Sequence, residues 1–246
     1  SKFSNLCHGF FNRKGGVSNG IFNSLNCGLN SSDKKKDILK NINIVCKKIG
    51  IVNKKLIMLN QIHSNKFHFI SCSNLIKRKS LYGDALITNK KNIALGVLTA
   101  DCVPILIFDK NKDIISAIHA GWKGAYKDIV KKVIKFLIKK GSHKRDIIAV
   151  VGPCISEKSY EVKKDLMNKF IKKNKTNKRF FIFKNKKTYF SLNGYIYNQL
   201  KIMGIKNLEI IKKDTFNPKN NFFSARKSIQ NKNNDYGRNI SIIMIN

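Results

Sequence analysis

The chain has 246 residues, 42% of them hydrophobic, and this length supports one substantial core, so we predict a single domain over residues 1–246. Its net charge of +35 comes mainly from lysine, since only six of the 49 basic residues are arginine. Proteins that read DNA bases favour arginine, whose planar side chain forms two parallel hydrogen bonds, so we expect no specific nucleic-acid partner. No apolar run approaches the roughly 18 residues of a membrane-spanning helix, so we expect no membrane partner.

The first half of the chain combines one predicted helix, over residues 37–49, with several predicted strands. Short continuous apolar runs predict buried strands, because a strand covered on both faces carries no polar side. These runs lie at residues 56–59, 85–88, 94–98, 105–108 and 114–118.

The pattern changes at residue 125. Apolar residues at helical spacing, with lysines opposite them, predict a helix over residues 125–140 that Gly141 ends. A buried strand is predicted at 147–151 and a loop at 172–178, where polar and basic residues interrupt the periodicity. Asn193 is the expected cap of a helix that continues to Gly204. Two further strands are predicted at residues 208–211 and 240–245.

Strands and helices mix without a regular βαβ order, so we predict an α+β fold, a layered α/β/β/α sandwich with mixed sheets. The sequence contains neither a Walker motif nor Gly-x-Gly-x-x-Gly, the usual loops for nucleotide phosphates. We expect a monomer or a small homo-oligomer.

The six cysteines include no Cys-x-x-Cys pair and are too sparse for a disulfide framework, so we expect reduced thiols. Cys154, in Gly-Pro-Cys, is expected to be buried. Residues 1–6 lack a basic segment that leads into an apolar stretch and a small-residue cleavage site. We therefore expect a cytoplasmic location without a secretory signal.

Three soft-donor side chains stand at or just beyond the ends of predicted strands: His63, Cys102 and His119. Two imidazoles and a thiolate suit zinc with a fourth position left open, which is typical of catalytic sites. Neighbouring strands present their ends side by side, so side chains distant in sequence can converge there. The same side chains also allow a metal-free hydrolase, with Cys102 as nucleophile and a histidine as its base.

Two other classes are weaker alternatives. A copper-dependent phenol oxidase needs several coppers and many histidines, and the chain has five histidines in all. The second is a basic protein that binds nucleic acid through its net charge, without catalysis. However, the excess lysines stand beside asparagine and isoleucine throughout the chain, so the lysine content is explained by an A+T-rich genome rather than by a binding function.

Seven motifs follow one another along nearly the whole chain: NRKGGVS (12–18), QIHS (61–64), GDALIT (83–88), TADCVPIL (99–106), HAGWKG (119–124), GPCI (152–155) with YEV (160–162), and FFSAR (222–226) with GR (237–238). In this order they resemble the YfiH/laccase-domain family of purine nucleoside phosphorylases. The resemblance implies an α+β fold and a catalytic zinc bound by His63, Cys102 and His119. Copper, from which the laccase name derives, is the second candidate metal.

The resemblance also implies a reaction. Its substrates would be purine nucleosides and phosphate: adenosine, inosine and guanosine would give the free base and ribose 1-phosphate. Phosphorolysis of 5'-methylthioadenosine and a separate deamination of adenosine are implied as well. An open zinc position suits deamination because zinc lowers the pKa of bound water toward 7.

Further residues have candidate roles around this centre. Phosphorolysis needs fixed cations to position the anionic nucleophile, and we expect Arg13 and Lys123, each beside glycines, to supply them. Lys123 stands where the family usually has arginine. Asp101 either orients a ligand and carries a proton or stabilises its turn, and Gln61 either contacts substrate or supports the loop. Arg226 and Arg238 have no role that the sequence alone defines.

Overall fold

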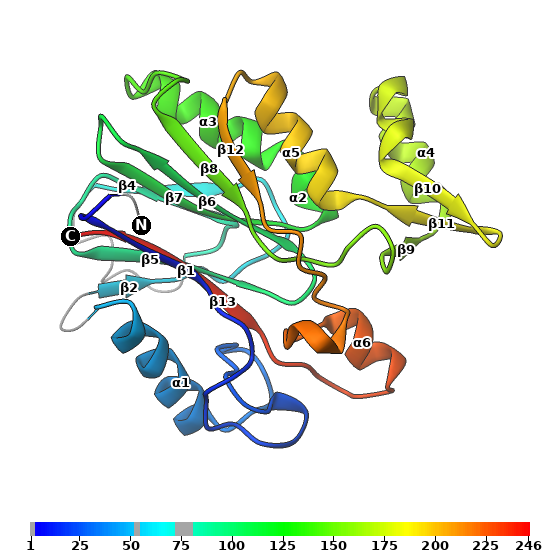
Figure 1. The fold of residues 1–246 in the computed structure, drawn as a ribbon, viewed down its shortest axis with the longest axis horizontal. Coiled ribbons are helices and arrows are strands. Elements are labelled where there is room, and N and C mark those ends of the chain that lie inside the picture. The colour runs from blue at the N-terminus through cyan, green and yellow to red at the C-terminus, as the bar shows by residue number, and fades with distance from the viewer. Residues whose placement is uncertain (1–2, 52–54, 72–80) are drawn as a thin grey trace.

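The computed structural model describes residues 3–51, 55–71 and 81–246. Two β-sheets pack face to face and helices cover their outer surfaces (Figure 1). This is the predicted α/β/β/α sandwich, and parallel and antiparallel pairs occur within each of the two sheets, as the prediction of mixed sheets requires. No helix in the described ranges is long and apolar enough to cross a membrane.

The larger of the two sheets has the strand order β12-β8-β6-β7-β4-β3. Every residue of its central strands β4, β6 and β7 is buried, which explains why these strands are continuous apolar runs. The strands are β3 (Phe67–Ile70), β4 (Ala85–Thr88), β6 (Val103–Asp109), β7 (Ile114–Ala120), β8 (Ile147–Val151) and β12 (Asn207–Ile210).

Helices α2 (Trp122–Tyr126), α3 (Ile129–Lys139) and α5 (Leu192–Ile202) cover the outer face of this sheet (Figure 1). The apolar side of α3, including Val133 and Leu137, is fully buried in the largest hydrophobic cluster together with sheet residues such as Ile105. Burial of this face is what holds the helix on the sheet, since each buried aliphatic side chain contributes about 1.5–3 kcal/mol.

The second sheet has the order β1-β13-β5-β2 and lies between the larger sheet and α1 (Figure 1). Its elements are β1 (Leu6–Phe10), β2 (Lys55–Ile57), β5 (Ile93–Thr99), β13 (Asn239–Ile245) and α1 (Lys35–Lys48). One hydrophobic cluster joins the two sheets, and it includes Leu95 and Ile115. Another, with Val45 and Ile242, joins the second sheet to α1.

A smaller unit extends from the sandwich at one side (Figure 1). It contains α4 (Lys164–Lys173) and a three-stranded sheet of β9 (Glu161–Val162), β10 (Phe181–Lys184) and β11 (Lys187–Phe190). Its core is aromatic: the rings of Phe181 and Phe190 stack at 4.6 Å and Phe170 packs against both. The remaining elements of the described residues are helix α6 (Ala225–Gln230) and 3₁₀ turns at Gly20–Phe22, Lys175–Phe180 and Pro218–Asn220.

The helix predicted over 125–140 is two helices. Asp128, between α2 and α3, has a left-handed backbone (φ 61°), which no α-helix interior accommodates. Its carboxylate accepts hydrogen bonds from Gln199 at 2.9 Å and from Lys173 at 2.6 Å, so contacts from α5 and α4 stabilise the break.

Two other local predictions are wrong. The predicted loop at 172–178 contains the end of α4 and a 3₁₀ turn, because the Asn174 side chain caps that turn and Asn177 donates to the carbonyl of Phe170. The N-cap of α5 is Ser191 rather than Asn193, which is the second residue of the helix. The five cysteines in the described part of the chain are free, Cys154 is buried, and Cys72 lies outside that part.

Candidate metal centre

Three loops and strand ends bring His63, Cys102 and His119 together. His63 follows β2 on a turn with a left-handed backbone (φ 54°), Cys102 directly precedes β6, and His119 lies within β7 rather than after it. Their ligand atoms all lie within 4.8 Å of one another. The Cys102 sulfur is 3.8 Å from His63 Nε2, close to the roughly 3.5 Å between two tetrahedral zinc ligands with bonds of about 2.0 and 2.3 Å.

The register of the larger sheet explains why the centre forms here. Val103 of β6 pairs with Ala120 of β7, so the next residues outward, Cys102 and Gly121, face each other. A Cβ at Gly121 would lie 2.8 Å from His63 Cδ2 and 2.9 Å from the Cys102 sulfur. Only glycine leaves room for both ligands at this position.

Asp84 supports the centre through hydrogen bonds, although the sequence alone indicates no role for it. It is fully buried and accepts a hydrogen bond from His119 Nδ1 at 2.8 Å. It also accepts from the backbone N–H of His63 at 3.0 Å and from the N–H and hydroxyl of Ser64 at 2.6 and 2.7 Å. Because Nδ1 of His119 is bonded to Asp84, Nε2 is the ring nitrogen left to face Cys102 and His63. Metal-binding histidines commonly have this arrangement.

Charge is distributed over this cluster in a way that favours a thiolate. Burial by itself would raise the pKa of the Cys102 thiol, but the adjacent charge and hydrogen bond of His119, with those of His63, lower it to about 7. Burial would lower the pKa of His119, but Cys102 and Asp84 raise it to about 9. Hydrogen bonds from His119 and Ser64 hold the pKa of Asp84 below its ordinary value despite burial.

The centre opens into a cavity of about 390 Å³, a size typical of small-molecule sites. The three ligands line it, and its apolar walls include Met58, Leu59, Leu81 and Leu98. Its polar lining side chains are Asn30, Asn60, Gln61, Thr99, Tyr236 and Arg238. A cavity that combines apolar walls with a few convergent polar groups suits a flat heterocycle joined to a polar group.

Gln61 and Asp101 are both held in place by the protein itself. The Gln61 amide donates to the carbonyl of Leu98 and accepts from its N–H, both at 2.7 Å, while the residue lines the cavity. Asp101 is buried on a turn with φ 84° and accepts from Thr215, Ser224 and the N–H of Arg226. These bonds stabilise the turn that precedes Cys102.

The two expected phosphate cations do not line this cavity. Arg13 donates to the carbonyl of Asn23, packs on the Phe223 ring at 4.5 Å, and lines a separate hollow of about 490 Å³. Lys123 lies exposed on α2, with its ammonium 5.7 Å from the centre of the neighbouring Trp122 ring system. Trp122 itself packs against the largest hydrophobic cluster.

The chain is similar to known proteins over nearly its whole length. A family model described as multi-copper polyphenol oxidoreductase laccase matches residues 7–246. The chain belongs to this family. Relatives include a protein of Rickettsia conorii, 34% identical over 79% of this chain and 82% of its own, and one of Bacteroides thetaiotaomicron, 31% identical over 92% and 88%. Both of these relatives are named purine nucleoside phosphorylases.

Solved structures of family members have the same fold. A YfiH protein of Bacillus licheniformis superimposes with a TM-score of 0.89 at 26% identity, over 98% of this chain and 93% of that one. A Neisseria meningitidis protein gives 0.86 at 26% identity, over 99% and 95%. Together with the named relatives, this likeness supports an enzyme of the nucleoside phosphorylase type.

Proposed function

We propose that this family member is a zinc-dependent purine nucleoside phosphorylase whose metal ligands are His63, Cys102 and His119. One observation carries the proposal: these three side chains, from three separate chain segments, converge in the lining of one cavity of small-molecule size. The naming of relatives 31–34% identical over most of their length supports the choice of purine nucleosides and phosphate as substrates.

The donor set fits zinc better than copper. One thiolate and two imidazoles leave one tetrahedral position open, and Gly121 supplies the space that two adjacent ligands need. Bound zinc would polarise an oxygen of substrate or lower the pKa of a bound water. Laccase chemistry requires several coppers, whereas the described residues contain one His/Cys/Asp/Glu cluster able to hold a metal.

The reaction breaks one bond and forms one. A phosphate oxygen bonds to C1' of the ribose as the bond from C1' to the purine nitrogen breaks, the electron pair leaves with the base, and the base takes up a proton. Positive character develops on the ribose while phosphate stays anionic, so fixed charges and dipoles determine the rate. The chain's contribution is to seat the nucleoside between the apolar walls and to keep the ligand side chains aligned through Asp84.

The same site would accept 5'-methylthioadenosine, since apolar residues such as Met58 and Leu81 line the cavity and suit its methylthio group. It would also deaminate adenosine, because an activated water adds to C6 and ammonia leaves without any need for phosphate. A cytoplasmic setting, where thiols are reduced, suits a zinc site with a free cysteine ligand.

A metal-free hydrolase is the second candidate, and one geometric observation favours it. The contacts run from Cys102 to His119 and from His119 to Asp84, the order in which a nucleophile, its base and an orienting carboxylate contact one another. This arrangement gives His63 no role, although His63 lies 3.8 Å from the sulfur, and zinc ligation uses all three residues.

The deciding experiment incubates metal-analysed protein with inosine or adenosine, with and without phosphate, and identifies products by chromatography. Phosphate-dependent ribose 1-phosphate is expected, together with hypoxanthine from inosine or adenine from adenosine, and about one zinc per chain. His119→Ala should lose zinc and turnover together, while Lys35→Ala, at an exposed surface lysine, should keep both. A zinc-free protein that forms a thioester at Cys102 would establish the hydrolase instead.

A further inference from the structure

One side chain in the wall of the cavity carries a permanent charge. Among the described lining residues Arg238 is the single lysine or arginine, although the whole chain contains 49 such residues. No aspartate or glutamate is among these lining residues either. Apart from the metal and its candidate ligands, an anionic substrate would therefore find one fixed cationic side chain among the described lining residues, and that side chain is an arginine.

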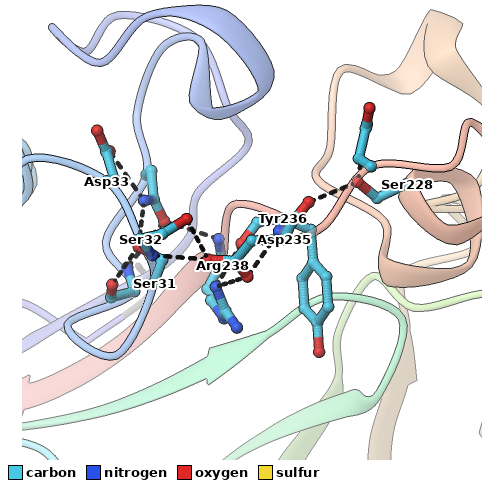
Figure 2. Close-up of polar contacts among 10 residues, drawn as sticks. Ser31, Ser32, Asp33, Ser228, Asp235, Tyr236 and Arg238 are labelled. Atoms are coloured by element: carbon cyan, nitrogen blue, oxygen red, sulfur yellow. Dashed lines mark hydrogen bonds and ion pairs between the residues drawn. The ribbon is translucent and has the colours of Figure 1, made fainter.

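Arg238 is fixed in place through one edge of its guanidinium. Nη1 donates to Asp235 Oδ1 at 2.9 Å and to the carbonyl of Tyr236, and the guanidinium lies 4.3 Å from the centre of the Tyr236 ring (Figure 2). Both of these bonds use Nη1, and no described residue accepts a hydrogen bond from Nε or Nη2, so these two nitrogens remain as donors. Two parallel donors on one edge match two oxygens of a phosphate.

Asp235 is in turn held by a loop from the other end of the chain. It accepts from the N–H of Ser32 at 2.7 Å, from the Ser32 hydroxyl at 3.1 Å and from the N–H of Tyr236 at 2.7 Å (Figure 2). Burial by itself would raise the pKa of Asp235, but these bonds and the Arg238 charge hold it below its ordinary value. The carboxylate therefore stays ionised and keeps the guanidinium oriented.

The path of the Arg238 side chain also depends on the opposite loop. A Cβ at Gly28 would lie 2.4 Å from Arg238 Cδ, so any other residue at 28 would displace the arginine. Asn26 fixes the backbone on both sides of this contact, since its Oδ1 accepts from the N–H of Gly28 and of Arg238, each at 2.9 Å. The backbone held by Asn26, the space left by Gly28 and the carboxylate of Asp235 therefore fix the position of the Arg238 guanidinium before any ligand binds.

We propose that Arg238 binds the phosphate cosubstrate in this cavity and that Asp235 is its positioning residue. The proposal rests on the phosphorolysis proposed above, which requires an anion beside the nucleoside. Arg238 thus replaces Arg13 and Lys123 as the expected phosphate-binding residue, since neither of those two lines the cavity. A guanidinium already oriented by Asp235 loses little freedom when it binds a bidentate oxyanion.

The test measures inosine phosphorolysis by the full-length zinc-loaded protein while phosphate is varied. Arg238→Gln should raise the KM for phosphate by about 10- to 100-fold, the range expected for losing hydrogen bonds to a charged group, with the KM for inosine within about 2-fold. Arg238→Lys should recover part of this loss, because it restores charge without the fork. Asp235→Asn should raise the KM for phosphate by a smaller factor.

Controls separate folding, the phosphate site and the reaction itself. Zinc content and the circular dichroism spectrum establish that each variant is folded, and Arg179→Gln, at a surface arginine bonded to Asn198, should behave as wild type. If wild type is active and Arg238→Gln and Arg238→Lys keep the wild-type KM for phosphate, or if Arg13→Gln or Lys123→Gln alone raises it, Arg238 is not the anchor. Wild type without phosphate-dependent turnover would instead overturn the proposed function, and this assignment with it.

Discussion

Asp84 Oδ1 lies 2.8 Å from Nδ1 of His119, and both side chains are buried, with 0% and 3% of their surface exposed. The same carboxylate holds the backbone at His63, so one acid aligns two of the three candidate metal ligands. Because strand β4 begins at the next residue, the sheet itself fixes where this carboxylate stands.

Replacing Asp84 with asparagine should weaken zinc binding by about 10- to 100-fold, since the partner that orients a metal-binding histidine typically contributes this much. The amide has a similar shape but no charge, and one end of it donates instead of accepting. Zinc affinity can be measured by competition with a chromogenic chelator. Asp165→Asn, at an exposed carboxylate on α4, is the matched control and should bind zinc as wild type. Unchanged affinity in Asp84→Asn would contradict the role given to this acid.

Gly121→Ala tests the close packing of the centre. The added methyl would lie 2.8 and 2.9 Å from His63 and Cys102, so one of the two ligands must move. We expect zinc content to fall well below one per chain, while the circular dichroism spectrum stays that of wild type. Gly194→Ala introduces the same methyl in α5, outside the cavity, and should retain zinc. A Gly121→Ala protein with full zinc content would show that the ligands have more room than the structure gives them.

The strands that carry this centre could be predicted from the sequence, because a strand that is buried on both faces consists of a continuous run of apolar residues. The predicted bounds 85–88 coincide with β4, every residue of which is buried, and the predicted bounds 147–151 coincide with β8, where buried and half-buried residues alternate. The two- to four-residue strands β9, β10 and β11 leave no such signal, since pairing with one another and packing of Phe170 and Phe190 define them.

The polar residues around the centre were harder to find. Asp84 is a single acid before an apolar run, and only its burial reveals that it must have partners. Arg238 stood out as one of six arginines, yet its place depends on a loop about 200 residues earlier in the chain. Arg13 stands beside glycines, and the sequence favours it as a cation that positions phosphate. In the fold, a Cβ at Gly16 would lie 2.2 Å from the Ser24 carbonyl, so close backbone packing explains that glycine.

Among the cysteines that the structure describes, Cys102 should be the most readily alkylated in the metal-free protein. A pKa lowered from 9.0 to about 7 means that its thiolate forms as pH rises through 7, two units earlier than for an ordinary thiol. Iodoacetamide labelling followed by peptide mass spectrometry should give a midpoint near pH 7 at Cys102. Cys27, whose pKa burial and Cys46 raise to about 12, should stay unlabelled in the folded protein. Saturating zinc should protect Cys102; equal labelling with and without zinc would argue against ligation.

Zinc binding should also stabilise the fold, and this stabilisation should depend on the three proposed ligands. A ligand that binds only the folded state adds about 2.7 kcal/mol at 100 times its Kd, which for a chain of this length raises Tm by about 5–10 °C. Thermal unfolding followed by circular dichroism, with the protein first stripped by a chelator and then resupplied, measures the shift. Cys102→Ser should lose most of it, whereas Cys7→Ser, at a half-buried cysteine on β1, should keep it. Equal shifts in both variants would mean that zinc acts elsewhere, because only Cys102 belongs to the cluster formed with His63 and His119.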